Sequence, residues 1–92
     1  MAARKYIYFG EIYRFGYTLH CIDTSEEKVR NALIEEYVKT YKQRNCGSDP
    51  RKAYELRESG ADDYDEEDAE YYKTFLDELY IQRREFGEVY WT

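Results

Sequence analysis

The feature that most limits the fold of this chain is an acidic segment that carries an apolar stripe at helical spacing. Residues 62–78 contain nine carboxylates and one lysine, so the segment carries a formal charge of −8 in a chain whose net charge is −6. The apolar residues in and just after it recur at intervals of about three or four: Ala69, Tyr72, Phe75, Leu76 and Leu79. This pattern predicts a helix, capped by Asp65, that buries one face and leaves its carboxylates on the other.

The N-terminal part of the chain predicts a β-hairpin. Residues 5–14 are rich in β-branched and aromatic side chains, which suit a pleated sheet. Their alternation fails at Gly10, so we expect a β-bulge at Gly10–Glu11 that points Ile7, Phe9 and Ile12 toward the core. Phe15-Gly16 then supplies a turn, and residues 17–22 run back as a second strand.

Two helices are predicted between this hairpin and the acidic segment. Thr24 and Glu27 fit a capping box, and the following apolar residues recur at helical spacing to a predicted end near Asn45: Val29, Ala32, Leu33, Tyr37 and Tyr41. Gly47 is the predicted C-terminal cap. Asp49-Pro50 resembles an N-cap followed by a first helical residue, which predicts a second, short helix ending at Ser59-Gly60.

The tail returns to strand-like composition over residues 79–91, and Phe86–Tyr90 repeats the pattern of Phe9–Tyr13. It forms either one bulged strand or a second hairpin. The predicted fold class is α+β: a small antiparallel sheet, made of the N-terminal hairpin and a C-terminal strand or hairpin, packed against two or three helices. The predicted order is ββααβ(β), with a third, acidic helix before the last strand. Residues 1–92 have the length of a single domain.

Composition limits both the core and the location. Only 17 of the 92 residues are Ile, Leu, Val or Phe, so the twelve tyrosines are needed to complete the core. No segment has the length of a transmembrane helix, and the N-terminus lacks the apolar stretch of a signal peptide. Cys21 and Cys46 fit no metal-ligand spacing and favour free thiols in a reducing compartment. We therefore expect a cytoplasmic protein with no membrane partner.

The chain offers no residue set for catalysis or for a cofactor. His20 and Cys21 are adjacent, but neighbours on a strand point to opposite faces and cannot form a nucleophile–base pair. The acids from Asp63 onward resemble the start of a calcium-binding EF-hand loop. However, Asp68 stands where that loop needs glycine, and Thr74 stands where it needs glutamate. We therefore expect no enzyme activity, no cofactor and no metal site.

One alternative is a small regulatory or nucleic-acid-binding module. Its contacts would come from basic residues within residues 39–52, at the junction of the first two helices: Lys39, Lys42, Arg44, Arg51 and Lys52. The acidic balance of the whole chain disfavours direct nucleic-acid binding and favours the interpretation that these residues solvate exposed faces.

The acidic segment is the preferred candidate for a binding surface, although charged helix faces are commonly only solvated. Tyrosine, which is enriched at interfaces, stands among its carboxylates. The candidate partner-binding residues are Asp62, Asp63, Tyr64, Asp65, Glu66, Glu67, Glu70, Tyr71, Asp77 and Glu78. In size, acidity and this tyrosine–carboxylate segment the chain resembles the small inhibitor proteins of phages and mobile elements, such as anti-CRISPR proteins and other DNA mimics.

That resemblance implies a non-enzymatic inhibitor whose partner is a host protein with a basic nucleic-acid-binding groove. The residues themselves add one further expectation. A tyrosine-rich strand edge would also permit a homodimer.

Overall fold

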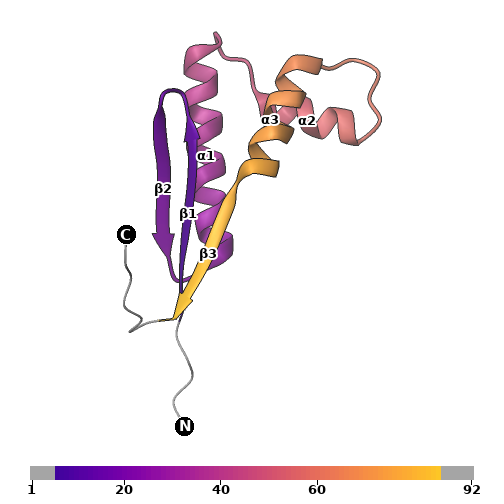
Figure 1. Ribbon diagram of the computed structural model, residues 1–92. Coiled ribbons are helices and arrows are strands. Elements are labelled where there is room, and N and C mark those ends of the chain that lie inside the picture. Colours follow the sequence, from indigo (N-terminus) through magenta and orange to yellow (C-terminus); the bar gives the residue numbers. More distant parts are fainter. Residues whose placement is uncertain (1–5, 86–92) are drawn as a thin grey trace. The chain divides into compact units, whose positions relative to one another are not determined.

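The fold is α+β, as predicted, and its elements follow the order ββαααβ. In the computed structural model, which describes residues 6–85, they are β1 (Tyr6–Arg14), β2 (Tyr17–Asp23), α1 (Glu26–Arg44), α2 (Pro50–Glu58), α3 (Glu66–Glu78) and β3 (Tyr80–Glu85) (Figure 1). The predicted strand or hairpin over residues 79–91 is one strand as far as Glu85. The repeat at Phe86–Tyr90 lies outside the described residues.

The chain divides into two compact units. Among the described residues, the first comprises 6–33 and 80–85, and it contains the three strands and the start of α1. The second comprises residues 34–79, with the rest of α1 together with α2 and α3. The helix α1 is continuous across the division at Leu33. No helix among residues 6–85 has both the length and the apolar character required to cross a membrane.

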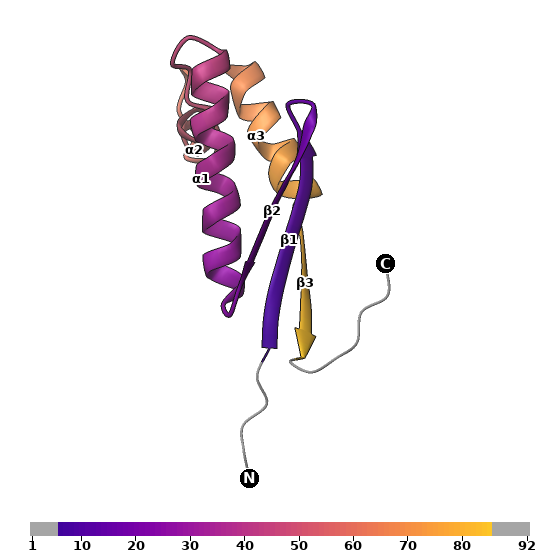
Figure 2. The ribbon, with the colours of Figure 1, turned by 90° about the vertical axis from the view of Figure 1, so that its left-hand side faces the viewer.

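The first unit is built on an antiparallel sheet with the strand order β2-β1-β3 (Figure 2). Phe15 and Gly16 both have positive φ in the two-residue loop between Arg14 and Tyr17, as a type I′ hairpin requires. Pairing is regular along β1: Gly10 lies between Cys21 of β2 and Ile81 of β3, and no residue is inserted on either side. The predicted bulge at Gly10–Glu11 is therefore wrong.

The close approach of a helix explains Gly10. A Cβ atom on Gly10 would lie 2.6 Å from Leu33 Cδ1 and 2.6 Å from Val29 Cγ1. The glycine thus allows the start of α1 to pack directly on β1, and this helix-facing side of the sheet buries Ile12 and Leu19. Because side chains alternate along a strand, Ile7 and Phe9 point to the opposite face from Gly10 and Ile12. Their predicted inward orientation, on the same side as Ile12, is wrong as well.

The helix boundaries follow local capping chemistry. In α1, Ser25 Oγ accepts a hydrogen bond from Lys28 N at 3.4 Å, so the cap lies one residue after the predicted Thr24. The α1 helix ends at Arg44, close to the prediction, and Gly47 follows with φ +88°. Asp49 caps α2 by accepting from Lys52 N, with Pro50 in the first turn, as predicted. Ala32, predicted to face the core, is exposed.

The second unit has a core rich in aromatic residues. Phe75 is fully buried, and its ring stacks on that of Tyr37 with centroids 4.1 Å apart and planes 9° from parallel. Tyr72 lies against Tyr37 and against Tyr54 of α2. The shortage of aliphatic side chains is thus compensated by tyrosine rings, each of which buries a large area.

Candidate acidic binding surface

The surface is displayed by α3 and by the loop before it. Asp65 caps the helix, as predicted, because its side chain accepts a hydrogen bond from Asp68 N at 2.9 Å. Ala69, Tyr72 and Phe75 are buried, which fixes the rotation of α3 about its axis. As a result, nine of the ten candidate residues are exposed and Tyr64 is partly buried.

Two hydrogen bonds join α1 to α3 at the edge of this surface. The hydroxyl of Tyr41 donates to Asp68 Oδ1 at 2.6 Å, and the hydroxyl of Tyr37 donates to the carbonyl oxygen of Tyr71 at 3.3 Å. Burial raises the pKa of Tyr41 strongly, and its hydrogen bond to the Asp68 carboxylate adds to this increase. Asp68 therefore serves to hold the helix in place, in contrast to the neighbouring carboxylates that face solvent.

The raised pKa of Tyr41 predicts a loss of stability in alkali. A tyrosine with a higher pKa in the folded state than in the unfolded state stabilises the fold fully below pH 10, and this contribution disappears as the pH rises. Above pH 10, Tyr41 alone should lower the free energy of unfolding by about 1.4 kcal/mol per pH unit. We expect Tyr41→Phe to be less stable at pH 7 but to show a shallower decline from pH 10 to 12, measured by urea unfolding. An unchanged slope would contradict this assignment.

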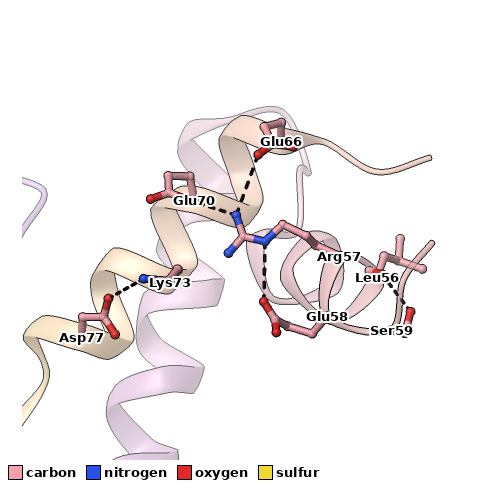
Figure 3. Close-up of polar contacts among 8 residues, drawn as sticks. All are labelled: Leu56, Arg57, Glu58, Ser59, Glu66, Glu70, Lys73 and Asp77. Atoms are coloured by element: carbon pink, nitrogen blue, oxygen red, sulfur yellow. Dashed lines mark hydrogen bonds and ion pairs between the residues drawn. The ribbon is translucent and has the colours of Figure 1, made fainter. Parts of the chain in front are cut away.

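Several carboxylates of the surface are held by cations of the same unit (Figure 3). Arg57 of α2 lies with its Nη1 atom 3.0 Å from Glu70 Oε2 and 3.9 Å from Glu66 Oε1. Its Nε atom lies 3.6 Å from Glu58 Oε1. The hydrogen bond to Glu70 is the main reason why the pKa of Arg57 is raised. Arg57 therefore anchors the first half of the acidic face to α2.

A second cation acts within α3 itself. Lys73 Nζ lies 3.0 Å from Asp77 Oδ2, one helical turn further along (Figure 3). The spacing of four residues made this pair predictable from the sequence. The role of Arg57 was not predictable, because it depends on how α2 packs against α3 and no sequence spacing encodes that packing.

Three carboxylates of the surface have no such partner among the described residues. Within residues 6–85, no cation lies at ion-pair distance from Asp62, Asp63 or Glu67. Glu67 lines a shallow hollow on α3, together with Glu66, Glu70, Tyr71 and Thr74. Tyr71 is 51% exposed. The ring of Tyr71 and the carboxylate of Glu67, which has no cation partner among residues 6–85, thus lie at the same hollow of α3.

The two ends of α3 differ in their electrostatics. Glu66, Glu67 and Asp68 lie in the first turn, where the helix dipole favours negative charge. Asp77 and Glu78 lie at the opposite end, where the dipole disfavours it, and the last turn contains no basic residue. The acids at the C-terminal end therefore do not contribute to the stability of the helix through its dipole.

The basic junction at residues 39–52 is less available than its composition suggests. Lys42 Nζ lies 3.3 Å from Asp49 Oδ2, and Arg51 donates a hydrogen bond to Glu35. Lys39 and Lys52 are exposed. At least two of the five cations are thus engaged with acids of their own unit, which weakens the alternative that this junction contacts phosphates.

The histidine and the two cysteines are not among the ten candidate residues. His20 pairs with Glu11 and Cys21 with Gly10, so their side chains point to opposite faces of the sheet, as predicted. The ring of His20 stacks on Phe9 with centroids 6.3 Å apart. Cys21 and Cys46 are free thiols. In the described part of the chain, no group of three or more His, Cys, Asp or Glu side chains is arranged to hold a metal ion.

No protein-family model matches this chain, and the searches of curated proteins and of solved structures gave no significant match.

Proposed function

We propose that the protein is a non-enzymatic inhibitor that binds, through the acidic surface of α3 and its preceding loop, a basic nucleic-acid-binding groove of a host protein. The observation that carries this proposal is the exposed face at the start of α3. There, the carboxylate of Glu67, which has no cation partner among residues 6–85, lines a shallow hollow together with the half-exposed ring of Tyr71. This arrangement combines negative charge for a basic partner with an aromatic side chain for contact.

The charge density of α3 supports the comparison with a nucleic acid. The helix has 13 residues, six of which are carboxylates. At 1.5 Å per residue it is about 20 Å long, and a single DNA strand carries about six phosphates over that distance. Carboxylates therefore follow one another along α3 about as densely as phosphates along one strand, while Arg57 and Lys73 offset part of this charge at Glu66, Glu70 and Asp77. An anti-CRISPR protein or another DNA mimic would present its charges in this way.

The electrostatic cost of the segment points in the same direction. Carboxylates crowded along one helix repel one another, and Asp77 and Glu78 also oppose the helix dipole, each at a cost of about 0.3–1 kcal/mol. A helix selected only for stability would carry Lys or Arg in its last turn. A basic partner offsets this cost at the moment of binding.

A pull-down from a lysate of a host cell tests the proposal. At 50 mM salt, the immobilised protein should retain basic nucleic-acid-binding proteins, and added duplex DNA should displace them. The double variant Asp63→Asn/Glu67→Gln should weaken binding of the captured protein by up to about 30-fold, since each exposed charge pair contributes about 0.2–1 kcal/mol. Isothermal titration calorimetry with the captured protein measures this change.

A matched variant controls for net charge. Glu36→Gln/Glu55→Gln removes two exposed carboxylates of the same unit that are not among the ten candidate residues, and it should leave the affinity unchanged. Tyr71→Ala should weaken binding by about 30-fold or more, because a central aromatic anchor typically contributes about 2 kcal/mol. If DNA fails to displace the captured protein, or if both double variants behave alike, the proposal is wrong.

A further inference from the structure

The sheet of the first unit has a face that the start of α1 does not cover. Because Gly10 and Ile12 point toward α1, the residues that alternate with them along β1 point away from it, as do the partners of those residues on β2 and β3. We call this the outer sheet face. It comprises Ile7, Phe9, Glu11 and Tyr13 of β1, Thr18, His20 and Ile22 of β2, and Tyr80, Gln82 and Arg84 of β3.

Exposed apolar side chains gather on this face. Ile22 is 63% exposed, and Tyr13 and Tyr80 are each 64% exposed. Of the five large apolar side chains that are exposed among the described residues, these three lie on the outer sheet face. Ile22 pairs directly with Phe9, and Tyr80 pairs with the next residue of that face, Glu11. Exposed apolar residues that gather on one face of a sheet indicate an interaction surface, whereas isolated exposed apolar residues do not.

The charge of this face distinguishes it from the rest of the molecule. Its only formal charges are those of Glu11 and Arg84, which cancel, while the whole chain carries −6. Two copies that met through their acidic helices would repel each other. Two copies that meet through the outer sheet face bring together neutral, largely apolar surfaces.

We propose that the outer sheet face binds a second copy of this chain, with the two sheets packed face to face about a two-fold axis. The pairing register places the axis. In the middle of the face, Phe9 pairs with Ile22 of β2 and with Gln82 of β3. Two residues further along β1, Glu11 pairs with Tyr80. Two residues before Phe9, Ile7 pairs with Arg84. An axis that crosses the strands at Phe9 therefore stacks Phe9 on Phe9 and Ile22 on Ile22 of the two copies.

The same axis makes the charges complementary. Rotation about this axis places Arg84 of one copy opposite Tyr80 of the other copy, next to the Glu11 with which that Tyr80 pairs. The guanidinium, which also donates a hydrogen bond to Gln82 Oε1 of its own chain at 2.7 Å, thus lies near an aromatic ring and a carboxylate of the other copy. Each contact occurs twice because of the symmetry. Face-to-face sheets pack about 10 Å apart, a distance that Arg and Tyr side chains span together.

The small area of the face predicts a weak dimer. Three strands of about seven residues each present roughly 350 Å² of projected area on one copy. An interface of this size belongs with those of transient complexes, so we expect dissociation constants of about 10–100 μM and a dimer that is evident at millimolar concentration. This dimer does not depend on the function proposed for the acidic surface.

Analytical ultracentrifugation from 5 μM to 1 mM tests the dimer. The unmodified chain should shift from monomer to dimer over this range, and Ile22→Lys should remain monomeric. Tyr17→Lys is the matched control, because Tyr17 is also exposed on β2 but lies on the opposite face of the sheet. This variant should still dimerise. Circular dichroism of each variant checks that the sheet is retained.

A charge exchange tests the arrangement itself. Glu11→Arg and Arg84→Glu should each weaken dimerisation by about 10-fold, and the double variant should restore it because the exchanged charges meet again. A chain that remains monomeric at 1 mM overturns the proposal, as does an Ile22→Lys variant that dimerises normally. A third outcome also overturns the proposal: the full chain stays monomeric, but a variant without residues 86–92 dimerises. That result would show that the chain's own tail occupies this face.

Discussion

Gly10→Val is expected to destabilise the protein more than any substitution of an exposed residue on β1. Even the Cβ atom of alanine would lie 2.6 Å from Val29 Cγ1 and Leu33 Cδ1. Leu33 can change rotamer, but Val29 is fully buried and its β-branched side chain has one strongly preferred rotamer in a helix. We expect a loss of about 1–3 kcal/mol for Gly10→Ala and a larger loss for Gly10→Val, measured by urea unfolding.

Glu11→Ala provides the control, because Glu11 is exposed on the adjacent position of the same strand and its removal should change stability by less than about 0.5 kcal/mol. A second variant, Val29→Ala, should recover part of the loss caused by Gly10→Ala, because the smaller side chain makes room for the new methyl group. The two substitutions should therefore be non-additive by about 0.5–3 kcal/mol. Additive effects would mean that Gly10 is not required for the close approach of α1.

Gly10 also shows where sequence reasoning fails. The fold class, the order of elements and the caps at Asp49 and Asp65 are each encoded by local patterns of a few residues, and the structure confirms them. The alternation of β1 breaks at Gly10 for a reason that is not local. The glycine makes room for side chains of a helix about 20 residues further along the chain. A bulge and a helix contact give the same sequence pattern, so the pattern alone cannot distinguish them.

The candidate surface was predictable to a similar extent. Helical periodicity separates the buried residues of α3 from its exposed carboxylates, and the structure places all ten candidate residues at the surface or only partly buried. The helical periodicity of the sequence does not reveal which carboxylates already have partners. Arg57 engages Glu66 and Glu70 from another helix, and Tyr41 engages Asp68 from a third. The carboxylates that remain uncompensated, Asp62, Asp63 and Glu67, are identified only when the helices are packed together.

Phe75→Ala is the second substitution with a large expected effect. Phe75 is fully buried, and its ring stacks on Tyr37 at 4.1 Å, so truncation removes an aromatic pair and leaves a cavity. Substitutions of this kind cost about 3–5 kcal/mol. A domain of this length has a total stability of roughly 5–14 kcal/mol, so the variant should be partly unfolded at 37 °C or close to it. Urea unfolding at 10 °C measures the loss.

Tyr71→Ala is the matched control for Phe75→Ala, because it truncates an exposed aromatic residue of the same helix and should cost less than about 1 kcal/mol. Together the two variants separate folding from binding. Phe75→Ala should weaken partner binding only in proportion to the unfolded fraction, and its amides in α2 and α3 should lose protection from hydrogen exchange. Tyr71→Ala should keep that protection and still lose affinity. If Phe75→Ala were as stable as Tyr71→Ala, the aromatic core of the second unit would not determine how α3 presents its carboxylates.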